Sequence, residues 1–454
     1  MPEQQTLLWE SGSGSAPLPP LVDPQTVAQE EQPLVALYRS YGPVFRLPQP
    51  GQEPEVILAG SEANIFMARH EDEFFTTGQH WEKFDATISQ HKSTMTNARD
   101  GAANRKRRAE SSRQWSRARI LDQIPQTIDL TLDLTKGWPG SSVPVHASMR
   151  RLVAEQLGQL LLGYSPGDYL DDFITYLNTA LASTLMRSDN TGDGLDSAAY
   201  QRASQRVKEF SRKAYEAHLL HPQPTGKPDM IDDAIQGAQD YPEAYRKALL
   251  EMVALGPMLA GIDTVANSLS FMAYALLAHP DIRQRVQAEV DTAFSSGPLT
   301  WEKLRQMRDL NGAMMETLRR YPVAGSHSAL VVNPLTIGGY RLEPGNRVRV
   351  AMTVPHFLPE LYPHPWEFDI DRFRDPRNEH RQRGAYAPFG LGDHTCLGAG
   401  IAEVQMMITM ATLLSSYTLE FDPPYYQLVI EHHPTSVPGN NFHLKVSPRH
   451  PSAS

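Results

Sequence analysis

The stretch FGLGDHTCLG, Phe389 to Gly398, decides how this sequence is interpreted, because it holds the only cysteine among 454 residues, Cys396. A lone cysteine is most often a small buried apolar residue in an apolar run. Here the thiol has polar residues directly before it and glycines around it, at Gly390, Gly392 and Gly398. Glycines let a large flat group approach the backbone closely. The setting therefore indicates a chemical use of the thiol.

A helix is expected directly after the cysteine. Apolar residues follow it with a 4-3-4-3 spacing, at Leu397, Ile401, Val404, Ile408 and Ala411, as on one face of a helix. The thiol would then lie at a helix N-terminus, where exposed N–H groups favour a thiolate. A thiolate can act as a nucleophile or bind a metal. A nucleophile needs an oriented base, a role that the position of His394 does not establish, whereas ligation of haem iron needs only the loop.

The loop resembles the pattern Phe-x-x-Gly-x-(His or Arg)-x-Cys-x-Gly of the cytochrome P-450 superfamily at every fixed position. The resemblance implies that Cys396 is the axial thiolate ligand of haem b. It also implies that Gly390 and Gly398 admit the macrocycle, that Phe389 covers the sulfur and that His394 faces a haem propionate. The alternative is that Cys396 has only a structural role.

Two further segments are similar to marks of this family. Glu316 and Arg319, within METLRRYP, match its Glu-x-x-Arg pair. The same spacing recurs elsewhere in the chain, and what distinguishes this pair is the proline and the predicted strand region that follow it. HFLPELYPHPWEFDIDRF, His356 to Phe373, resembles the segment that supplies a second arginine, with Ile370 where proline is common. The resemblance implies that Arg372 joins Glu316 and Arg319 in a buried structural network, which loses several kcal/mol if one partner is removed.

The third mark is AGIDT, within the longest helical candidate, residues 242–278. Pro257 should bend this helix, because it lacks the N–H and crowds the preceding turn. The resemblance implies that Gly261 leaves room for dioxygen and that Asp263 and Thr264 are catalytic, relaying protons to it. The alternative is a threonine that only bonds back to the carbonyl four residues earlier.

Haem propionates need cationic or hydrogen-bonding partners. The segment DGAANRKRR resembles the family's Gly-x-x-His-(x)3-Arg helix, with Asn104 in place of the histidine and Arg108 at the arginine position. Arg108 and His394 are the propionate candidates. The strand that usually supplies another arginine has none, and His327 is a candidate substitute. The basic run itself can be a solvated face, or it can steer an acidic ferredoxin.

The pattern along the chain predicts a mainly α fold with a minor β region (α+β). The resemblance implies the cytochrome P-450 fold, with the haem between the long central helix and the cysteine loop. Short apolar runs bounded by Pro and Gly predict a small sheet over residues 34–75, and helical periods dominate residues 99–320. Residues 1–33, rich in Pro, Gly and Ser, are expected to be a flexible leader. Residues 34–454 are expected to form a single domain.

Composition excludes several classes. A net charge of −10 and a pI near 5.9 argue against a nucleic-acid partner. A single cysteine suits a reducing compartment, so a cytoplasmic protein is expected. We also expect the protein to be a monomer. We find no signal peptide, membrane anchor or dinucleotide motif. Electrons would then come from separate proteins.

The resemblance covers about Leu34 to Val446. It implies a soluble, bacterial-type haem-thiolate monooxygenase that oxidises an apolar small molecule, such as a terpenoid, steroid, fatty acid or polyketide, with O2 and electrons from a ferredoxin and its reductase. The alternatives are a haem-thiolate isomerase or dehydratase without O2 activation, and a non-catalytic haem sensor. Chain position alone suggests a substrate pocket lined by Trp81, Phe84, Ile88, Leu259, Ala260, Val323 and Val437.

Overall fold

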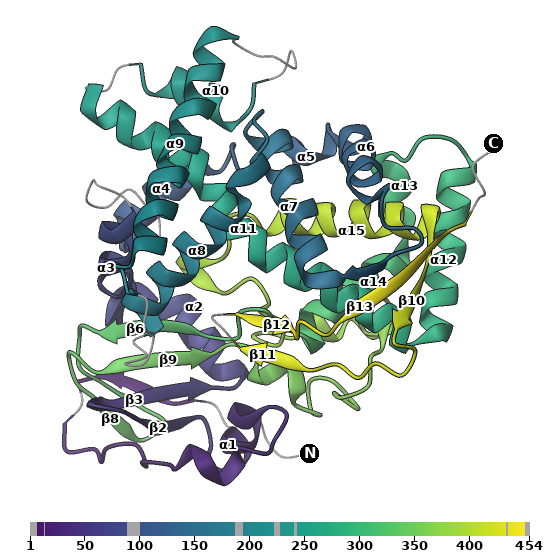
Figure 1. Cartoon of the computed structure of the whole chain (residues 1–454). Helices are drawn as coiled ribbons and strands as arrows, with labels where there is room; N and C mark the ends of the chain where they lie inside the picture. Colours follow the sequence, from purple (N-terminus) through teal and green to yellow (C-terminus); the bar gives the residue numbers. More distant parts are fainter. Residues whose placement is uncertain are drawn as a thin grey trace, which may run out of the picture. The chain divides into compact units, whose positions relative to one another are not determined.

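The computed structural model describes residues 7–12, 14–88, 100–186, 194–221, 228–239, 243–432 and 435–449 (Figure 1). The contacts between its residues group into two units. The first comprises Met1–Asp85, Met95–Glu110 and Ala324–Cys396, and the second comprises Ala86–Thr94, Ser111–Val323 and Leu397–Ser454. Helices predominate and the sheets are small, which confirms the predicted fold class. The single domain expected over residues 34–454 stays a prediction.

The first unit is built around a five-stranded sheet. Its strands, in spatial order, are β2 (Val44–Gln49), β3 (Gln52–Ala59), β9 (Arg347–Ala351), β6 (His327–Val331) and β4 (Phe75–Thr76). Only β3 and β9 of these run parallel, with Val56 opposite Val348. Val56 and Leu58 join one apolar cluster, whereas Ile57 and Ala59 join another. Because successive strand residues face opposite sides, both faces of β3 are buried, which explains its unbroken apolar run.

Helices and short turns pack around this sheet. The helices are α1 (Pro33–Tyr41), α2 (Ser61–Phe74), α3 (Gly78–Ile88), whose last residues belong to the second unit, and α4 (Gly101–Ser111). The 3-10 turns are η1 (Pro24–Val27), η5 (Val354–Phe357), η6 (Ile370–Phe373), η7 (Glu379–Arg381) and η8 (Gly392–His394). Through α2 and η8, the unit places a helix beside the cysteine loop.

The N-terminal segment differs from the flexible leader expected over residues 1–33. Strand β1 (Trp9–Ser11) pairs antiparallel with β7 (Leu335–Ile337), which in turn pairs with β8 (Tyr340–Leu342). Leu7 and Val22 are buried in the two apolar clusters. Edge pairing and burial by residues distant in the sequence therefore hold this stretch, despite its loop-like composition. Residues 1–6 and 13 lie outside the described residues.

The second unit holds most of the helices. They are α5 (Ala118–Leu121), α6 (Ile124–Thr135), α7 (Val145–Leu161), α8 (Leu170–Leu181), α9 (Ala198–Leu220), α10 (Met230–Gly237), α11 (Glu243–Ala278), α12 (Pro280–Ser295), α13 (Trp301–Gln306), α14 (Arg308–Arg320) and α15 (Ala399–Ser416), with the turns η3 (Gly167–Tyr169) and η4 (Ala182–Met186). The 36-residue α11 continues through Pro257 and contacts α7, α9, α14 and α15. It is the central helix of this unit.

Two small sheets complete the second unit. One has the order β10 (Tyr417–Asp422), β13 (His443–Pro448) and β5 (Ser142–Pro144), and the other pairs β11 (Ile430–His432) with β12 (Ser436–Pro438) (Figure 1). Strand β12 contacts α11. None of the helices in the described ranges has the length and apolar composition needed to cross a membrane.

Candidate functional site

The cysteine loop closes on itself through its backbone. The Cys396 N–H donates to the Phe389 carbonyl at 2.8 Å. Gly390 and Gly392 have φ of +81° and +63°, a region that glycine adopts without strain. A Cβ on Gly392 would also lie 3.3 Å from the Cα of Ala68 in α2. These two predicted glycines therefore shape the loop itself.

The helix after the cysteine begins later than expected. Gly398 is the N-cap of α15, and the first helical residue is Ala399. Cys396 therefore lies outside the helix, two residues before its N-cap, because the loop has its own turn. The sequence periodicity located the helix correctly, but the thiol is not on its first turn.

The loop has the surface that a large bound group needs. Cys396 is exposed, and Phe389 and Leu391 are only partly buried, whereas Ala385 and Ala387 directly before the loop are buried. An accessible thiol flanked by half-buried apolar side chains is a suitable donor set for haem iron and its apolar macrocycle. The residues present thus fit a haem bound through Cys396.

The predicted propionate candidates gather around this loop in the first unit. Arg108 donates to the Thr395 carbonyl. Asn104 is buried and donates from Nδ2 to the Asp393 carbonyl at 2.9 Å, and the same nitrogen lies 3.3 Å from His394 Nε2. Asn104 Oδ1 has no hydrogen-bond partner within the described part of the chain. A buried, unsatisfied amide oxygen normally has a partner such as water or a ligand.

The charge of Arg108 belongs to the same site. Burial lowers the pKa of Arg108, while the negative charges of Cys396, Asp393 and Glu71 act in the opposite direction. The guanidinium nevertheless stays protonated at neutral pH, because arginine starts from a very high pKa. Arg108 therefore brings a partly buried cation to the cysteine loop.

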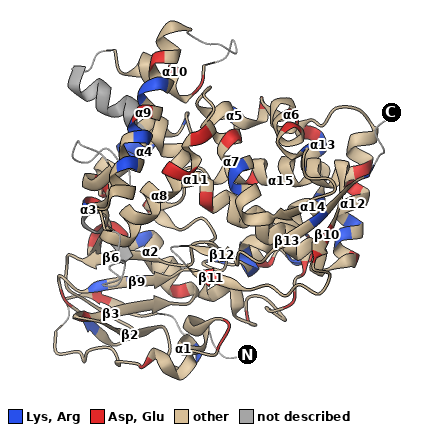
Figure 2. Cartoon of the chain, viewed as in Figure 1, with Lys and Arg blue, Asp and Glu red and all other residues tan. Residues whose placement is uncertain are grey.

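The rest of the basic run on α4 is partly neutralised. Figure 2 shows the cluster of Lys and Arg residues on this helix. Arg105 is half-exposed and pairs with Asp72 and, at 2.7 Å, with Asp393. Arg107 lies 3.7 Å from Glu110. The patch proposed to steer an acidic protein therefore carries less net positive charge than the letters NRKRR suggest.

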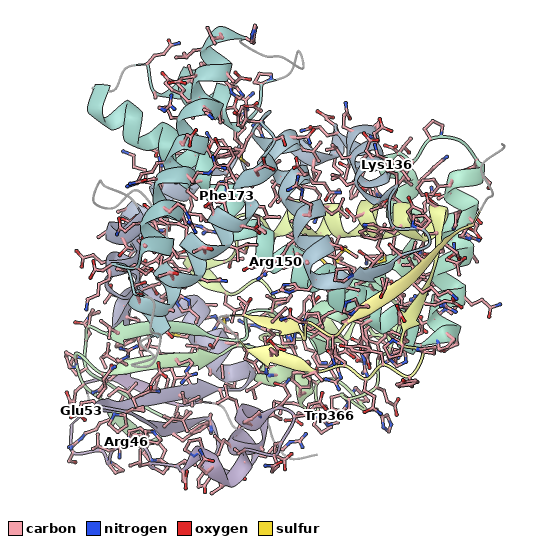
Figure 3. All side chains as sticks on the ribbon, in the orientation of Figure 1. Arg46, Glu53, Lys136, Arg150, Phe173 and Trp366 are labelled. Carbon is pink, nitrogen blue, oxygen red and sulfur yellow. The ribbon has the colours of Figure 1, made fainter. Side chains whose placement is uncertain are left out.

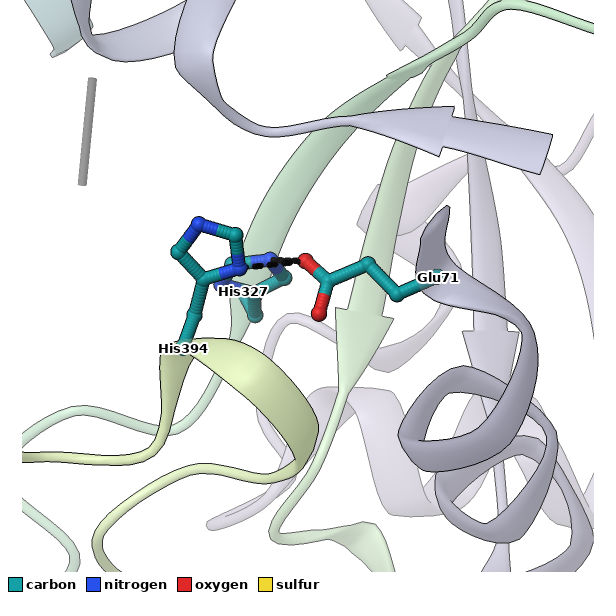
Figure 4. Close-up of side chains that lie close together, drawn as sticks. All are labelled: Glu71, His327 and His394. Atoms are coloured by element: carbon teal, nitrogen blue, oxygen red, sulfur yellow. Dashed lines mark hydrogen bonds and ion pairs between the residues drawn. The ribbon is translucent and has the colours of Figure 1, made fainter. Parts of the chain in front are cut away.

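His394 and His327 meet at a residue that sequence reasoning missed. Both imidazoles lie next to the carboxylate of Glu71, at the end of α2 (Figure 4). Glu71 stands in the acidic run EDEF, where nothing in the spacing distinguishes it from Glu73. Only the fold brings α2, β6 and the cysteine loop together.

In the second unit, the AGIDT residues lie on α11. Thr264 Oγ1 donates to the Ala260 carbonyl at 2.8 Å, the geometry of the back-bonding alternative. Asp263 is buried, and its Oδ1 accepts a hydrogen bond from Arg150 Nε at 2.7 Å. Arg150 lies on α7, near the centre of Figure 3. The acid of the predicted relay is therefore held by a salt bridge that the sequence did not predict.

Gly261 has a packing role beside its predicted one. A Cβ at this position would lie 2.8 Å from Cδ1 of Leu157 on α7. Real contacts are longer than this, so the absence of a side chain lets the two helices approach closely. The room for dioxygen that the resemblance implies stays a prediction.

His146 is a second residue missed in this region. It lies on α7, one turn before Arg150, and is buried, and its Nε2 has no hydrogen-bond partner among the described residues. Burial and the nearby charge of Arg150 together lower the pKa of His146 to about 4, against the smaller opposing effects of Asp263 and Asn267. His146 is therefore neutral at pH 7, next to the acid of the predicted relay.

The predicted ion network is present in parts. On α14, Arg319 Nε and Nη2 donate to Glu316 at 2.7 and 2.8 Å, and both side chains are fully buried. In the first unit, buried Arg372 donates from Nη1 to Glu379 at 2.9 Å and to the Pro363 carbonyl at 2.7 Å. That Arg372 joins Glu316 and Arg319 in a single network stays a prediction.

The predicted pocket residues fall in both units. In the first, Trp81 makes a ring contact with buried Phe84. In the second, Ile88 and Val437 are buried, Leu259 and Val323 are half-buried and Ala260 is exposed. A cavity of 250 Å³ in that unit is lined instead by Leu134, Trp138, Ala147, Ser148, Arg151 and Leu152. The substrate-pocket assignments thus stay predictions.

Comparisons with known proteins agree with the loop motif. The family described as "Cytochrome P450" matches residues 21–446. "Putative cytochrome P450 136" of Mycobacterium tuberculosis is 28% identical over 309 residues, which cover 67% of this chain and 62% of that protein. "Sterol 14alpha-demethylase" of Mycolicibacterium vanbaalenii is 32% identical over 169 residues, 37% of either chain. The matched segments thus span less than two thirds of these relatives.

Solved structures share the fold. The cyanobacterial structure "Retinoic acid bound cyanobacterial CYP120A1" has a TM-score of 0.80 and 22% identity, over 96% of this chain and all of that one. "Crystal structure of a Cytochrome P450 (CYP102L1)" has a TM-score of 0.79 and 21% identity, over 96% of this chain and 100% of that one. At these identities the likeness concerns the fold alone.

Proposed function

Because the chain belongs to the cytochrome P450 family, we propose that it is a haem-thiolate monooxygenase that inserts one oxygen atom of O2 into an apolar small molecule. The cofactor is haem b, and Cys396 is its thiolate ligand. The observation that carries the proposal is the exposed position of the chain's single cysteine in a glycine-shaped turn. When bound, the haem supplies an iron centre that accepts electrons and activates O2.

Apart from Gly398, the groups that hold the cofactor belong to the first unit. Cys396 binds the iron, Gly390 and Gly398 admit the macrocycle, and Phe389 covers the sulfur. Arg108, Asn104, His394 and His327 bind the propionates through charge-assisted hydrogen bonds. The placement of Arg108 and Asn104 against the loop carbonyls of Thr395 and Asp393 supports these roles.

The second unit provides the protons. Thr264 and Asp263 form the relay, with Thr264 donating from Oγ1 and Asp263 resupplying it. In the structure the Thr264 hydroxyl donates to Ala260 and the Asp263 carboxylate accepts from Arg150. Delivery of a proton therefore requires Thr264 to exchange its acceptor, while the Arg150 contact holds the Asp263 carboxylate in position.

A large hydrocarbon framework is the substrate class that the relatives favour. The names of two relatives refer to a sterol and to the alcohol cyclooctat-9-en-7-ol. The second relative is a monooxygenase of Streptomyces melanosporofaciens that is 32% identical over 36% of this chain and 35% of that protein. We therefore place steroids and terpenoids before fatty acids and polyketides. A ferredoxin and its reductase supply the electrons, and the protein acts as a cytoplasmic monomer.

Turnover with a reconstituted redox system tests this function. NADH consumption should be matched by oxygenated product, and Thr264→Ala should continue to consume NADH while releasing peroxide instead of product. An isomerase or dehydratase would form product without O2, and a sensor would form none. Either result would reject the monooxygenase.

A further inference from the structure

A single carboxylate oxygen of Glu71 gathers three polar groups of the first unit. Oε1 lies 2.7 Å from His394 Nδ1, 2.8 Å from Thr77 Oγ1 and 3.2 Å from His327 Nε2. Figure 4 shows both imidazoles turned toward it, one from β6 and one from the cysteine loop. The side chains of Glu71 and His394 are 8% and 5% exposed, so water screens the contact little.

The positions of the hydrogens follow from these contacts. Thr77 Oγ1 also lies 2.9 Å from His327 Nε2. A carboxylate accepts only, so Thr77 gives its one hydrogen to Glu71 and in turn accepts from His327. His327 must therefore carry hydrogen on Nε2, and His394 must carry it on Nδ1. Glu71 thus fixes one nitrogen of each ring as a donor.

The ring orientation of His394 is fixed as a result. With Nδ1 on Glu71, its Nε2 points to the side of the loop where Asn104 Nδ2 lies 3.3 Å away and Asp100 lies 3.8 Å away. This is also the side that holds the unsatisfied Oδ1 of Asn104. The outward nitrogen therefore faces the other predicted propionate partners.

The surrounding structure accommodates an ionised Glu71. Burial opposes its ionisation, but hydrogen bonds from His327 and His394 prevail and hold the pKa of Glu71 well below its usual range. The carboxylate is charged at neutral pH.

We propose that Glu71 is the positioning residue of the haem-propionate site: its carboxylate orients His327 and His394 together, so that both rings present their second nitrogen to propionates. The proposal rests on the proposed function, in which Cys396 holds the haem. It explains how His327 can replace an arginine. A ring that donates to Glu71 from one nitrogen can donate to a propionate from the other only when both nitrogens carry hydrogen, and the neighbouring Glu71 carboxylate stabilises that form.

A metal ion is the competing occupant. The ligand atoms of Glu71, His327 and His394 lie within 4.8 Å of one another, and two histidines with a carboxylate suit Zn²⁺. However, the 2.7 Å contact between Glu71 and His394 is that of a charge-assisted hydrogen bond, with a proton where a metal would require none. The observed contacts therefore favour the hydrogen-bonded cluster.

The rate of haem transfer from the ferric protein to excess apomyoglobin tests the proposal. We expect Glu71→Gln to lose haem at least about 10-fold faster than wild type, the usual effect of removing a partner behind a directly bound group. Glu71→Asp, which keeps the charge but shortens the reach, should fall between the two. Glu73→Gln, on the same helix with a half-exposed side chain, is the matched control and should match wild type.

A double-mutant cycle separates positioning from a general structural effect. If Glu71 acts through both histidines, Glu71→Gln should speed haem loss less in the His327→Gln protein than in wild type, because only His394 is then left for it to orient. Full additivity would overturn the proposal, as would wild-type haem retention in Glu71→Gln. Stoichiometric zinc in the purified wild-type holoprotein, lost in Glu71→Gln, would instead establish the metal site.

The spectrum of the thiolate-bound haem distinguishes a failure of the proposed function from a failure of the role proposed for Glu71. Each variant is first reduced and treated with carbon monoxide, and its red-shifted Soret band shows that Cys396 still binds the iron. If wild type lacks this band, the proposed function fails. If all variants show it and Glu71→Gln keeps its haem, only the role of Glu71 fails.

Discussion

Asp263 is held by a partner on another helix. Its carboxylate is buried on α11 and contacts Arg150 on α7. A buried carboxylate without a partner would be costly. The salt bridge therefore holds Asp263 in place on α11, next in sequence to the hydroxyl that the proposed relay uses.

Removing the acidity of Asp263 should slow product formation. Asp263→Asn keeps the shape but cannot resupply a proton, so we expect product formation to fall by about 100-fold, in the range of general acid–base effects. Product is measured per haem, with the carbon monoxide band as the control for intact ligation. Unchanged product formation would exclude Asp263 from the relay.

His146 should make the protein sensitive to mild acid. Its pKa in the folded protein is about 4, against about 6.5 when unfolded. Between these values the unfolded chain binds a proton that the folded chain refuses, so stability falls as pH falls from 6.5 to 4. The difference corresponds to a loss on the order of 3 kcal/mol. Arg150 and Asp263 are the charged groups nearby.

We expect His146→Phe to reduce this acid sensitivity. The melting temperature is compared at pH 7 and pH 5 for the variant and wild type. The drop between the two pH values should be smaller in the variant, because Phe takes up no proton. An equal drop in both proteins would contradict the low pKa of His146.

Residues whose chemistry is local could be predicted from the sequence, and those whose partners are distant could not. Asn104 and Arg108 were found because they keep a fixed spacing on one helix, and both contact the cysteine loop. Glu71 pairs with residues about 250 to 320 positions away. Arg150 meets Asp263 only because α7 packs on α11.

At the scale of elements, the close approach of α7 and α11 is set by Gly261. A methyl group there would lie 2.8 Å from Leu157, whereas one on Gly256 in the same helix would lie 3.7 Å from Trp115, an ordinary contact. Both glycines are helical. Comparing substitutions at Gly261 and Gly256 therefore separates the effect of packing from the effect of helix propensity.

Gly261→Ala should destabilise the protein by about 1–3 kcal/mol, the usual cost of overpacking. Gly256→Ala should be neutral or should stabilise it by up to about 1 kcal/mol, since alanine is the better helix former. Thermal unfolding of both variants checks this. Equal effects of the two substitutions would contradict the proposed helix contact.

Strand β1 shows why the order of the N-terminal segment was not predicted. The segment around it is rich in Gly, Ser and Pro, a composition that favours disorder. Its order comes from the edge of β7 and from Leu7, which joins the apolar cluster of the sheet. Strand pairing and burial of this kind depend on residues far away in the sequence. A strand of three residues is too short to show them as a periodic pattern.

At the scale of the whole molecule, each unit carries its own buried charges. Arg319 and Glu316 are completely buried on α14. Arg212, which follows Glu209 at the same spacing, is half-exposed and pairs with Glu216. The same spacing thus gives a buried ion pair within the pattern at Glu316 and Arg319, whereas Arg212 pairs outside the pattern with Glu216 at the surface, a difference that spacing alone could not decide.

Arg319→Met should cost about 3–5 kcal/mol, because it leaves Glu316 charged and buried without its partner. Arg212→Met should change stability by less than about 0.5 kcal/mol, as exposed pairs contribute little. The melting temperatures of the two variants are compared with wild type. Equal losses would show that burial does not distinguish the two pairs.

The fold class, the long helix and the cysteine loop could all be predicted, because periodicity and one specific motif determine them. The substrate could not, since the suggested pocket residues come from segments of both units. Whether Glu316, Arg319 and Arg372 form one network could not be decided from the sequence patterns either. These features depend on packing between distant segments, which local patterns do not encode.

The most direct test of the account is the spectrum of the reduced protein with carbon monoxide. We predict that wild type shows the red-shifted Soret band of thiolate-bound haem and that Cys396→Ser lacks it. A wild-type protein without this band, or a Cys396→Ser variant that retains it, would contradict the assignment of the single cysteine as the iron ligand.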